Sequence, residues 1–180
     1  HRLGANEAPP AIISMYLGDE LQAVLESIKN GTAYDSKRKQ KMKIGVDVLP
    51  FIPKDSTDRN RTSPFAFTGN KFEFRSLGSS LSISGPNTTL NAIVANTLKQ
   101  FADELEKAKD FENSLHKLIR REITEHWKII FNGNGYDSSW VEEAQQRGLL
   151  NLKTLPDAMA EYLNPKNIKL FTDMGVYTQI

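Results

Sequence analysis

The sequence has 180 residues and a formal net charge of +1, with 25% charged and 39% hydrophobic residues, which is ordinary for one globular domain with its own core. The balanced charge gives no reason to expect a nucleic-acid or membrane surface, and the absence of cysteine excludes disulfides, zinc–thiolate sites and thiol catalysis. No apolar run is long enough to cross a bilayer and no signal peptide is recognisable, so we expect a cytoplasmic protein without nucleic-acid or membrane partners.

The chain opens with a loop, a strand and a helix. Residues 1–10 form a polar loop that contains two consecutive prolines, and the apolar run at residues 11–17 predicts a buried strand. Apolar side chains then recur at helical spacing over residues 19–29, which predicts a helix that Asn30-Gly31 ends.

The signals that follow this helix are weaker. Residues 37–43 are a basic run without an interleaved aromatic side chain that could stack on a base. This composition favours a solvated linker over contact with nucleic acid. Residues 45–52 predict another strand.

Residues 58–75, which read DRNRTSPFAFTGNKFEFR, predict a hairpin. Residues 64–67 form its first strand, Thr68-Gly69-Asn70 has the composition of a tight turn, and residues 71–75 alternate charged and aromatic side chains with the period of a strand. This alternation places the phenylalanines on one face and a charged set on the other. The charged set consists of Lys71, Glu73 and Arg75.

The charged face of this hairpin has two interpretations. The simpler one is a solvated strand whose charges pair weakly. However, three arginines and a lysine surround a single glutamate, and arginine binds carboxylates and phosphates through two parallel hydrogen bonds. A lone carboxylate among such cations is a candidate ligand for a divalent metal that accompanies phosphate. We therefore predict that Arg61, Glu73 and Arg75 share a pocket that faces an anion and its magnesium ion.

After residue 85 the pattern becomes helical. Gly85-Pro86-Asn87 predicts a helix start with Asn87 as the N-cap. The helix that follows carries an apolar stripe made of Leu90, Ile93, Val94, Leu98, Phe101 and Leu105.

Four more helices are predicted downstream. The first covers residues 111–131, and the shorter ones cover residues 137–147, 155–163 and 165–174. Thr154 and Asp157 predict a cap at the start of the helix over residues 155–163. The buried face of the helix over residues 111–131 is predicted to contain Leu115, Leu118, Ile119, Ile123, Trp127 and Ile130. The two tryptophans, Trp127 and Trp140, are expected to anchor the core. Judged alone, this helical half predicts a packing and interaction unit.

Two separated phrases together resemble one family. HRLGANEAPP at residues 1–10 resembles the Arg-Leu…Glu-Ala-Pro loop of glutamine synthetases, and residues 58–75 resemble their Asn-Arg segment and the strand that ends Glu-x-Arg. The sequences of these two segments are most similar to those of the large type III enzymes of bacteria. The resemblance implies an α+β fold, in which residues 1–85 form part of a catalytic domain with a flap loop and an arginine hairpin. Residues 86–180 would then form a helical C-terminal region.

The resemblance also implies an activity and a set of site residues. The activity is ATP-dependent ligation of ammonia to the γ-carboxylate of glutamate through γ-glutamyl phosphate, with Mg²⁺ or Mn²⁺ as cofactor. Arg2 and Arg75 match arginines that bind glutamate, and Glu7 matches the flap glutamate that takes part in ammonia attack. Arg61 matches an arginine that contacts the transferred phosphate of the nucleotide, and Lys71 matches an arginine that contacts the nucleotide. Glu73 matches a metal ligand.

The chain departs from the family pattern in several places. The flap loop is one residue shorter between Arg2 and Glu7, the segment between Leu17 and Asp58 looks like an insertion, and Ala66 stands where the common form has a nucleotide-binding arginine. The other metal ligands of the family are missing from the chain, so we expect a piece of a longer polypeptide that is inactive alone.

Two alternatives remain open at this point. One is a γ-glutamyl amine ligase on the same scaffold, and the other is a non-catalytic module whose helices mediate assembly. The resemblance further implies a large homo-oligomeric ring.

Overall fold

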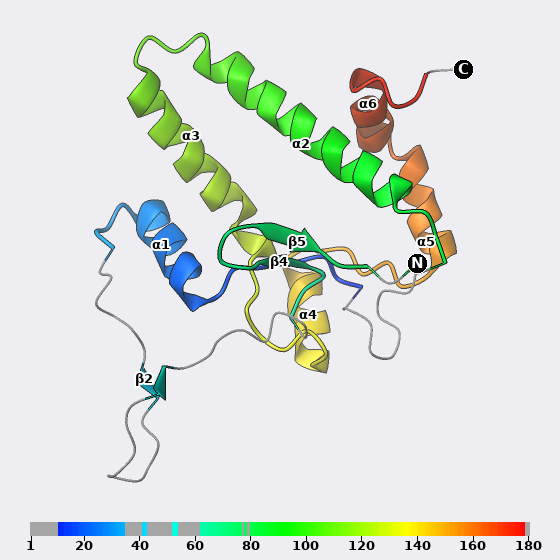
Figure 1. Cartoon of the computed structure of the whole chain (residues 1–180), viewed down its shortest axis with the longest axis horizontal. Helices are drawn as coiled ribbons and strands as arrows, with labels where there is room; N and C mark the ends of the chain where they lie inside the picture. The colour runs from blue at the N-terminus through cyan, green and yellow to red at the C-terminus, as the bar shows by residue number, and fades with distance from the viewer. Residues whose placement is uncertain are drawn as a thin grey trace.

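The computed structural model describes residues 11–34, 41–42, 52–53, 62–76, 78 and 80–178. It combines a small three-stranded sheet with a C-terminal half that is mainly helical (Figure 1). The fold class is therefore α+β, as predicted. A separate antiparallel pair consists of β2 (Lys41–Met42) and β3 (Ile52–Pro53). The loop predicted at residues 1–10, and most of the predicted basic run and second strand, lie outside the described residues.

The three-stranded sheet has the strand order β1–β4–β5. Its first strand, β1 (Met15–Tyr16), runs parallel to β4 (Phe65–Phe67), and β4 pairs antiparallel with β5 (Phe72–Phe74). The turn of the hairpin contains Gly69 at φ 94°, a conformation that favours glycine. The hairpin is thus confirmed.

β1 is shorter than the strand predicted over residues 11–17. The carbonyl of Ser14 accepts a hydrogen bond from the side chain of Ser63 rather than from a neighbouring strand. Further upstream, Ile12 packs into a core cluster with Trp140. These side-chain contacts take the place of ladder pairing, so only two residues of the apolar run form the strand.

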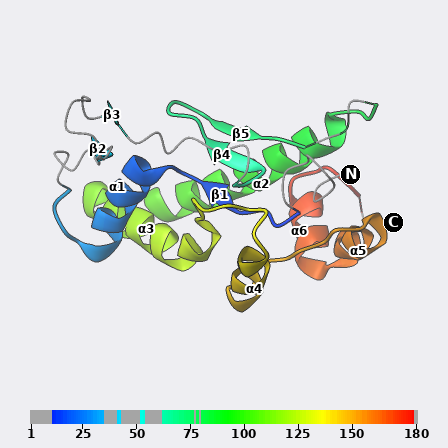
Figure 2. The same ribbon diagram turned by 90° about the horizontal axis from the view of Figure 1, so that it is seen from below.

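Helix α1 (Asp19–Asn30) matches its prediction to within one residue and is attached at both ends to distant parts of the chain. At its start, Oδ1 of Asn132 accepts hydrogen bonds from the backbone N–H of Leu17 (3.0 Å) and Gly18 (3.2 Å). At its end, Nε of Arg120 donates to the carbonyl of Lys29 (3.0 Å). Figure 2 shows the consequence, which is that α1 lies beside α3.

Two long helices, α2 (Ser84–Leu105) and α3 (Phe111–His126), form a helical hairpin whose arms diverge from the connecting turn (Figure 1). Near that turn, the guanidinium group of Arg121 binds both carboxylate oxygens of Glu104 at 3.0 and 2.9 Å. These hydrogen bonds hold the pKa of the Glu104 carboxyl below its usual value. Asp110 caps α3 by accepting from the backbone N–H of Asn113.

The predicted start of α2 is wrong. The helix begins at Ser84, so Asn87 lies inside it and is not the N-cap, and the Asn87 N–H donates to the carbonyl of Ile83. The reason is Pro86, because a proline has a helical φ and lacks an N–H, which suits the first turn of a helix. The apolar stripe predicted on α2 also remains largely open to solvent at Ile93, Val94 and Leu98.

The predicted end of α3 is also wrong. The α-helix stops at His126, a short 3₁₀ turn, η2 (Trp127–Ile129), follows, and Ile130 is extended. The extended residues reach β1, since Ile130 bridges Met15 in parallel and the N–H of Phe131 donates to the Met15 carbonyl at 3.0 Å. Pairing with β1 therefore ends the helix before residue 131.

The described core lies where α4 (Ser138–Gln146) meets the segment that precedes β1. Trp140 and Ala144 are each only 1% exposed and pack with Ile12, Phe131 and Leu149. The rings of Trp140 and Phe131 stack with their centroids 3.6 Å apart. Trp140 is therefore a core anchor, as predicted, whereas Trp127 is half-buried and lies beneath the Lys29 ammonium.

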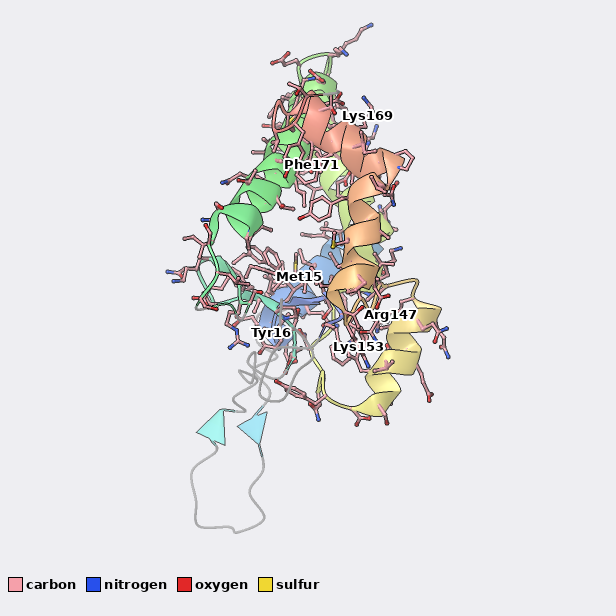
Figure 3. All side chains as sticks on the ribbon, turned by 90° about the vertical axis from the view of Figure 1, so that its right-hand side faces the viewer. Met15, Tyr16, Arg147, Lys153, Lys169 and Phe171 are labelled. Atoms are coloured by element: carbon pink, nitrogen blue, oxygen red, sulfur yellow. The ribbon has the colours of Figure 1, made fainter. Side chains whose placement is uncertain are left out.

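The last helices complete the described chain. The predicted helix over residues 155–163 is divided into α5 (Leu155–Met159) and a 3₁₀ turn, η3 (Ala160–Leu163), and Thr154 caps it as its sequence suggests. Helix α6 (Pro165–Asp173) follows and contacts α2, with Phe171 on the side toward α2 (Figure 3). Within the described part of the chain, none of the helices combines the length and apolarity that crossing a membrane requires.

The Phe131–Trp140 stack yields a stability test at Gly133. A Cβ atom at this position would come within 2.7 Å of the Phe131 ring, whose partner Trp140 is buried and has no room to shift. We expect Gly133→Ala to lower the free energy of unfolding in urea by about 1–3 kcal/mol. The control is Gly85→Ala, which meets nothing within 4 Å in helix α2. Equal stability of the two variants would contradict the close packing at Phe131.

Candidate functional site

The register of the sheet places the charged residues of the hairpin on one face. Tyr16 is paired with Ala66, and Ala66 with Glu73, so these three residues form a row across the three strands. Side chains of paired residues lie on the same face of a sheet, and Lys71 and Arg75 share this face because they are two positions from Glu73. The predicted alternation of the hairpin is therefore confirmed.

The opposite face carries the phenylalanines. Phe65 is paired with Phe74, and Phe67 with Phe72. Their ring centroids lie 5.2–6.3 Å apart, within the range in which aromatic pairs attract each other. Phe72 nevertheless remains 49% exposed.

The charged face is the more deeply buried one along the middle of the sheet. Tyr16 and Ala66, which lie in the same row across the strands as Glu73, are only 4% and 2% exposed. The Glu73 side chain is 29% exposed, and its Oε1 lies 3.2 Å from Nζ of Lys71, which is 65% exposed. Arg75 is half-buried. The candidate site is therefore a partly desolvated set of one carboxylate and two cations, where electrostatic interactions are stronger than in water.

A buried serine fixes the hairpin to β1. Ser63 is fully buried, its hydroxyl donates to the Ser14 carbonyl, and it accepts from the N–H of Phe65 at 3.1 Å. At the same open end of the hairpin, the N–H of Arg75 donates to the Pro64 carbonyl at 2.7 Å. Ser63 could not be singled out from the sequence, because a small polar residue before a proline is also typical of an ordinary loop.

Three of the predicted site residues cannot be placed. Arg2, Glu7 and Arg61 lie outside the described residues, although Arg61 directly precedes the buried Thr62. Of the predicted pocket, the structure brings Glu73 and Arg75 to one face, which Lys71 shares. That Arg61 joins them, and that the loop at residues 1–10 closes over them, stays a prediction.

The described residues do not by themselves fit a metal ion. No group of three histidine, aspartate or glutamate side chains among them is arranged to hold one. Glu73 offers a single carboxylate on a face with two cations, whereas a divalent metal bound by protein takes several oxygen ligands. A complete metal centre therefore needs ligands from other parts of the polypeptide.

The comparisons with known proteins establish the family. Residues 114–180 match the family model described as the glutamine synthetase C-terminal domain, a region that runs from within α3 to the last residue of the sequence. The chain belongs to the glutamine synthetase family, which agrees with the resemblance seen in its first 75 residues.

Three relatives show how much of such a protein the chain represents. It is 47% identical over 183 residues to a type-3 glutamine synthetase of Dictyostelium discoideum, 45% over 190 residues to a glutamine synthetase of Butyrivibrio fibrisolvens, and 41% over 169 residues to one of Bacteroides fragilis (strain YCH46). The alignments cover 90–100% of this chain but only 23–26% of the relatives. The chain thus spans about a quarter of the length of the relatives it matches.

The role of Ser63 as the link between the hairpin and β1 can be measured. Replacing Ser63 with alanine leaves the buried Ser14 carbonyl and the Phe65 N–H without the hydroxyl partner. We expect Ser63→Ala to lower the free energy of unfolding by about 1–3 kcal/mol, the usual range for orphaned buried groups. Ser76→Ala, at an exposed position just beyond the same hairpin, is the control and should change little. A Ser63→Ala protein as stable as this control would show that the hairpin does not depend on the serine.

Proposed function

We propose that this chain is part of a glutamate–ammonia ligase, which forms glutamine from glutamate, ammonia and ATP through γ-glutamyl phosphate. The proposal is carried by the 41–47% identity, over 90–100% of the chain, to three proteins named glutamine synthetase. Because the aligned region is about a quarter of each relative, the proposed activity belongs to a longer polypeptide. The chain alone would be inactive.

In this proposal the charged face of the hairpin binds anions and one metal ion. Glu73 would supply one ligand to Mg²⁺ or Mn²⁺, and such an ion, when bound, would supply stabilisation of the charge that develops in phosphoryl transfer. Arg75 holds the glutamate carboxylate and faces the phosphate. Its half-buried position supports this role, since a guanidinium that is partly removed from water binds a carboxylate more strongly than an exposed one.

The exposed Lys71 is proposed to contact the nucleotide. Its ammonium lies 3.2 Å from the Glu73 carboxylate, so it offsets the charge of that carboxylate in the described structure. A lysine is a point charge without the planar fork of an arginine. The nucleotide contact at this position would therefore be weaker and less directional than in relatives with arginine.

The remaining proposed roles rest on the resemblance alone. Arg61 contacts the transferred phosphate, Arg2 binds glutamate, and Glu7 takes part in the attack of ammonia. A loop that carries Glu7 over the site would keep water away from the reactive acyl phosphate. The other substrate contacts and metal ligands would come from the rest of the polypeptide.

The role of Glu73 is tested by Glu73→Gln in the complete polypeptide, because this change removes the charge and keeps the shape. A metal ion contributes several kcal/mol to catalysis, so we expect glutamine formation to fall by about 10²–10³-fold and to require more Mg²⁺. The control is Glu112→Gln, at an exposed carboxylate in the first turn of α3. Unchanged turnover and Mg²⁺ dependence in Glu73→Gln would refute the proposed site and favour a non-catalytic hairpin.

The role of Lys71 is tested by Lys71→Arg and Lys71→Gln. Arginine should lower the KM for ATP about two- to tenfold and leave kcat nearly unchanged, since one additional hydrogen bond contributes about 0.5–1.5 kcal/mol. Glutamine should raise the KM for ATP without a matching change in the KM for glutamate. The idea fails if both variants bind ATP as the unmodified protein does.

A further inference from the structure

We infer that Asn132 is a positioning residue, which fixes the strand next to the charged hairpin and through it the place of Glu73. This inference rests on the proposed function, because it concerns the geometry of the same site. Asn132 lies in the loop after α3, more than fifty residues beyond the hairpin, and it touches none of the proposed site residues in the described structure. Its effect on the site would be indirect, through β1.

The side chain of Asn132 makes three hydrogen bonds, all to the junction between β1 and α1. Its Oδ1 accepts from the N–H of Leu17 at 3.0 Å and of Gly18 at 3.2 Å, and its Nδ2 donates to Oε1 of Gln22 at 2.7 Å. These partners precede it by 110–115 residues. The amide thus uses both its acceptor and its donor on one short segment of the chain.

Among the described residues, no neighbouring side chain in the sequence caps this junction in place of the amide. Gly18 occupies the N-cap position of α1 with φ 78° and makes no side-chain cap. A helix start whose N–H groups lack an internal partner needs an acceptor from elsewhere. Asn132 provides that acceptor, so the position of the β1–α1 junction depends on a residue of the C-terminal half.

The junction is separated from Glu73 by one central strand. Leu17 directly follows Tyr16, and Tyr16 is paired with Ala66, which is paired with Glu73. With adjacent strands about 4.8 Å apart, the backbones of Tyr16 and Glu73 are about 10 Å apart. β1 has only two residues, so few ladder hydrogen bonds hold it in place without outside contacts. A shift of β1 would therefore also displace the paired residues Ala66 and Glu73 on the neighbouring strands.

The contact is suited to positioning rather than to folding as such. A neighbouring backbone bond, from the N–H of Phe131 to the Met15 carbonyl at 3.0 Å, does not involve the Asn132 side chain. Phe131 is in addition stacked on the buried Trp140. Removing the amide would leave these attachments intact and loosen the junction between β1 and the start of α1. Figure 3 locates β1, which leads into this junction, through Met15 and Tyr16.

The test compares Asn132→Ala, Asn132→Asp and Asn113→Ala in the complete polypeptide. Aspartate keeps the acceptor for Leu17 and Gly18, and its charge is favourable at a helix start, so it should rescue the function. Asn113 is exposed on α3 and its side chain has no partner among the hydrogen bonds of the described residues, which makes it a matched control. Kinetics are measured at a temperature where circular dichroism shows each variant fully folded.

For Asn132→Ala we expect the Mg²⁺ concentration for half-maximal activity to rise about 10-fold or more, which is the scale seen when residues that orient metal ligands are lost. For Asn132→Asp and Asn113→Ala, the Mg²⁺ concentration for half-maximal activity should stay within about twofold of that of the unmodified protein. Hydrogen exchange at backbone amides of residues 64–75 should also be faster in Asn132→Ala. If Asn132→Ala does not fold, Asn132→Ser, whose hydroxyl is shorter, takes its place with the same expectation.

Two outcomes overturn the inference and are separable from failure of the proposed function. If Glu73→Gln loses activity but folded Asn132→Ala keeps its Mg²⁺ dependence and its exchange rates, Asn132 contributes only to stability. If Asn132→Asp is as impaired as Asn132→Ala, the acceptor is not what positions the strand. Normal activity of Glu73→Gln, by contrast, refutes the proposed role of Glu73, and then the exchange rates alone decide whether Asn132 holds the hairpin. Absence of glutamine formation by the unmodified complete polypeptide is the result that refutes the proposed function itself.

Discussion

The described structure depends on the pairing of β1, a strand of only two residues. Met15 is bonded on one side to β4 and on the other to the extended residues that follow α3. An isolated two-stranded hairpin is marginally stable in water, so β4 and β5 need a further element to pack against. β1 provides it, and because β1 is also attached to the residues after α3, this short strand joins the hairpin to the helical half.

Helix α1 shows how the same region integrates a segment that looks like an insertion. The ends of a helix leave N–H and carbonyl groups without internal partners. In α1 the start is completed by Asn132, and at the end the Lys29 carbonyl accepts from Arg120, both of which belong to the region matched by the glutamine synthetase C-terminal domain. The segment after Leu17 is therefore bound into the fold at both ends of its helix.

Local signals in the sequence predicted local structure well. The alternation of residues 71–75, the cap at Thr154 and the glycine that ends α1 act over a few residues, so each could be recognised without the fold. The contacts that escaped prediction join distant residues, as Ser63 joins Ser14 across 49 positions and Asn132 joins Leu17 across 115. The end of α3 escaped for the same reason, because pairing with β1 overrides a helical pattern that continues to residue 131. For the site, the sequence predicted which side chains share the hairpin face, but not that this face is the more buried one.

The burial of the charged face bears on what the hairpin does. If its charges were only a solvated surface, the residues between them would be expected to face water as well, yet Ala66 and Tyr16 in the row with Glu73 are nearly inaccessible. A carboxylate beside such neighbours loses part of its hydration, and a cation must offset that loss. Lys71 does so in the described structure, but its side chain is mostly exposed and is long enough to turn away from Glu73. A partly desolvated acid with an exchangeable cation partner is what a site for a charged ligand requires, and this favours the binding interpretation of the face over the solvated one.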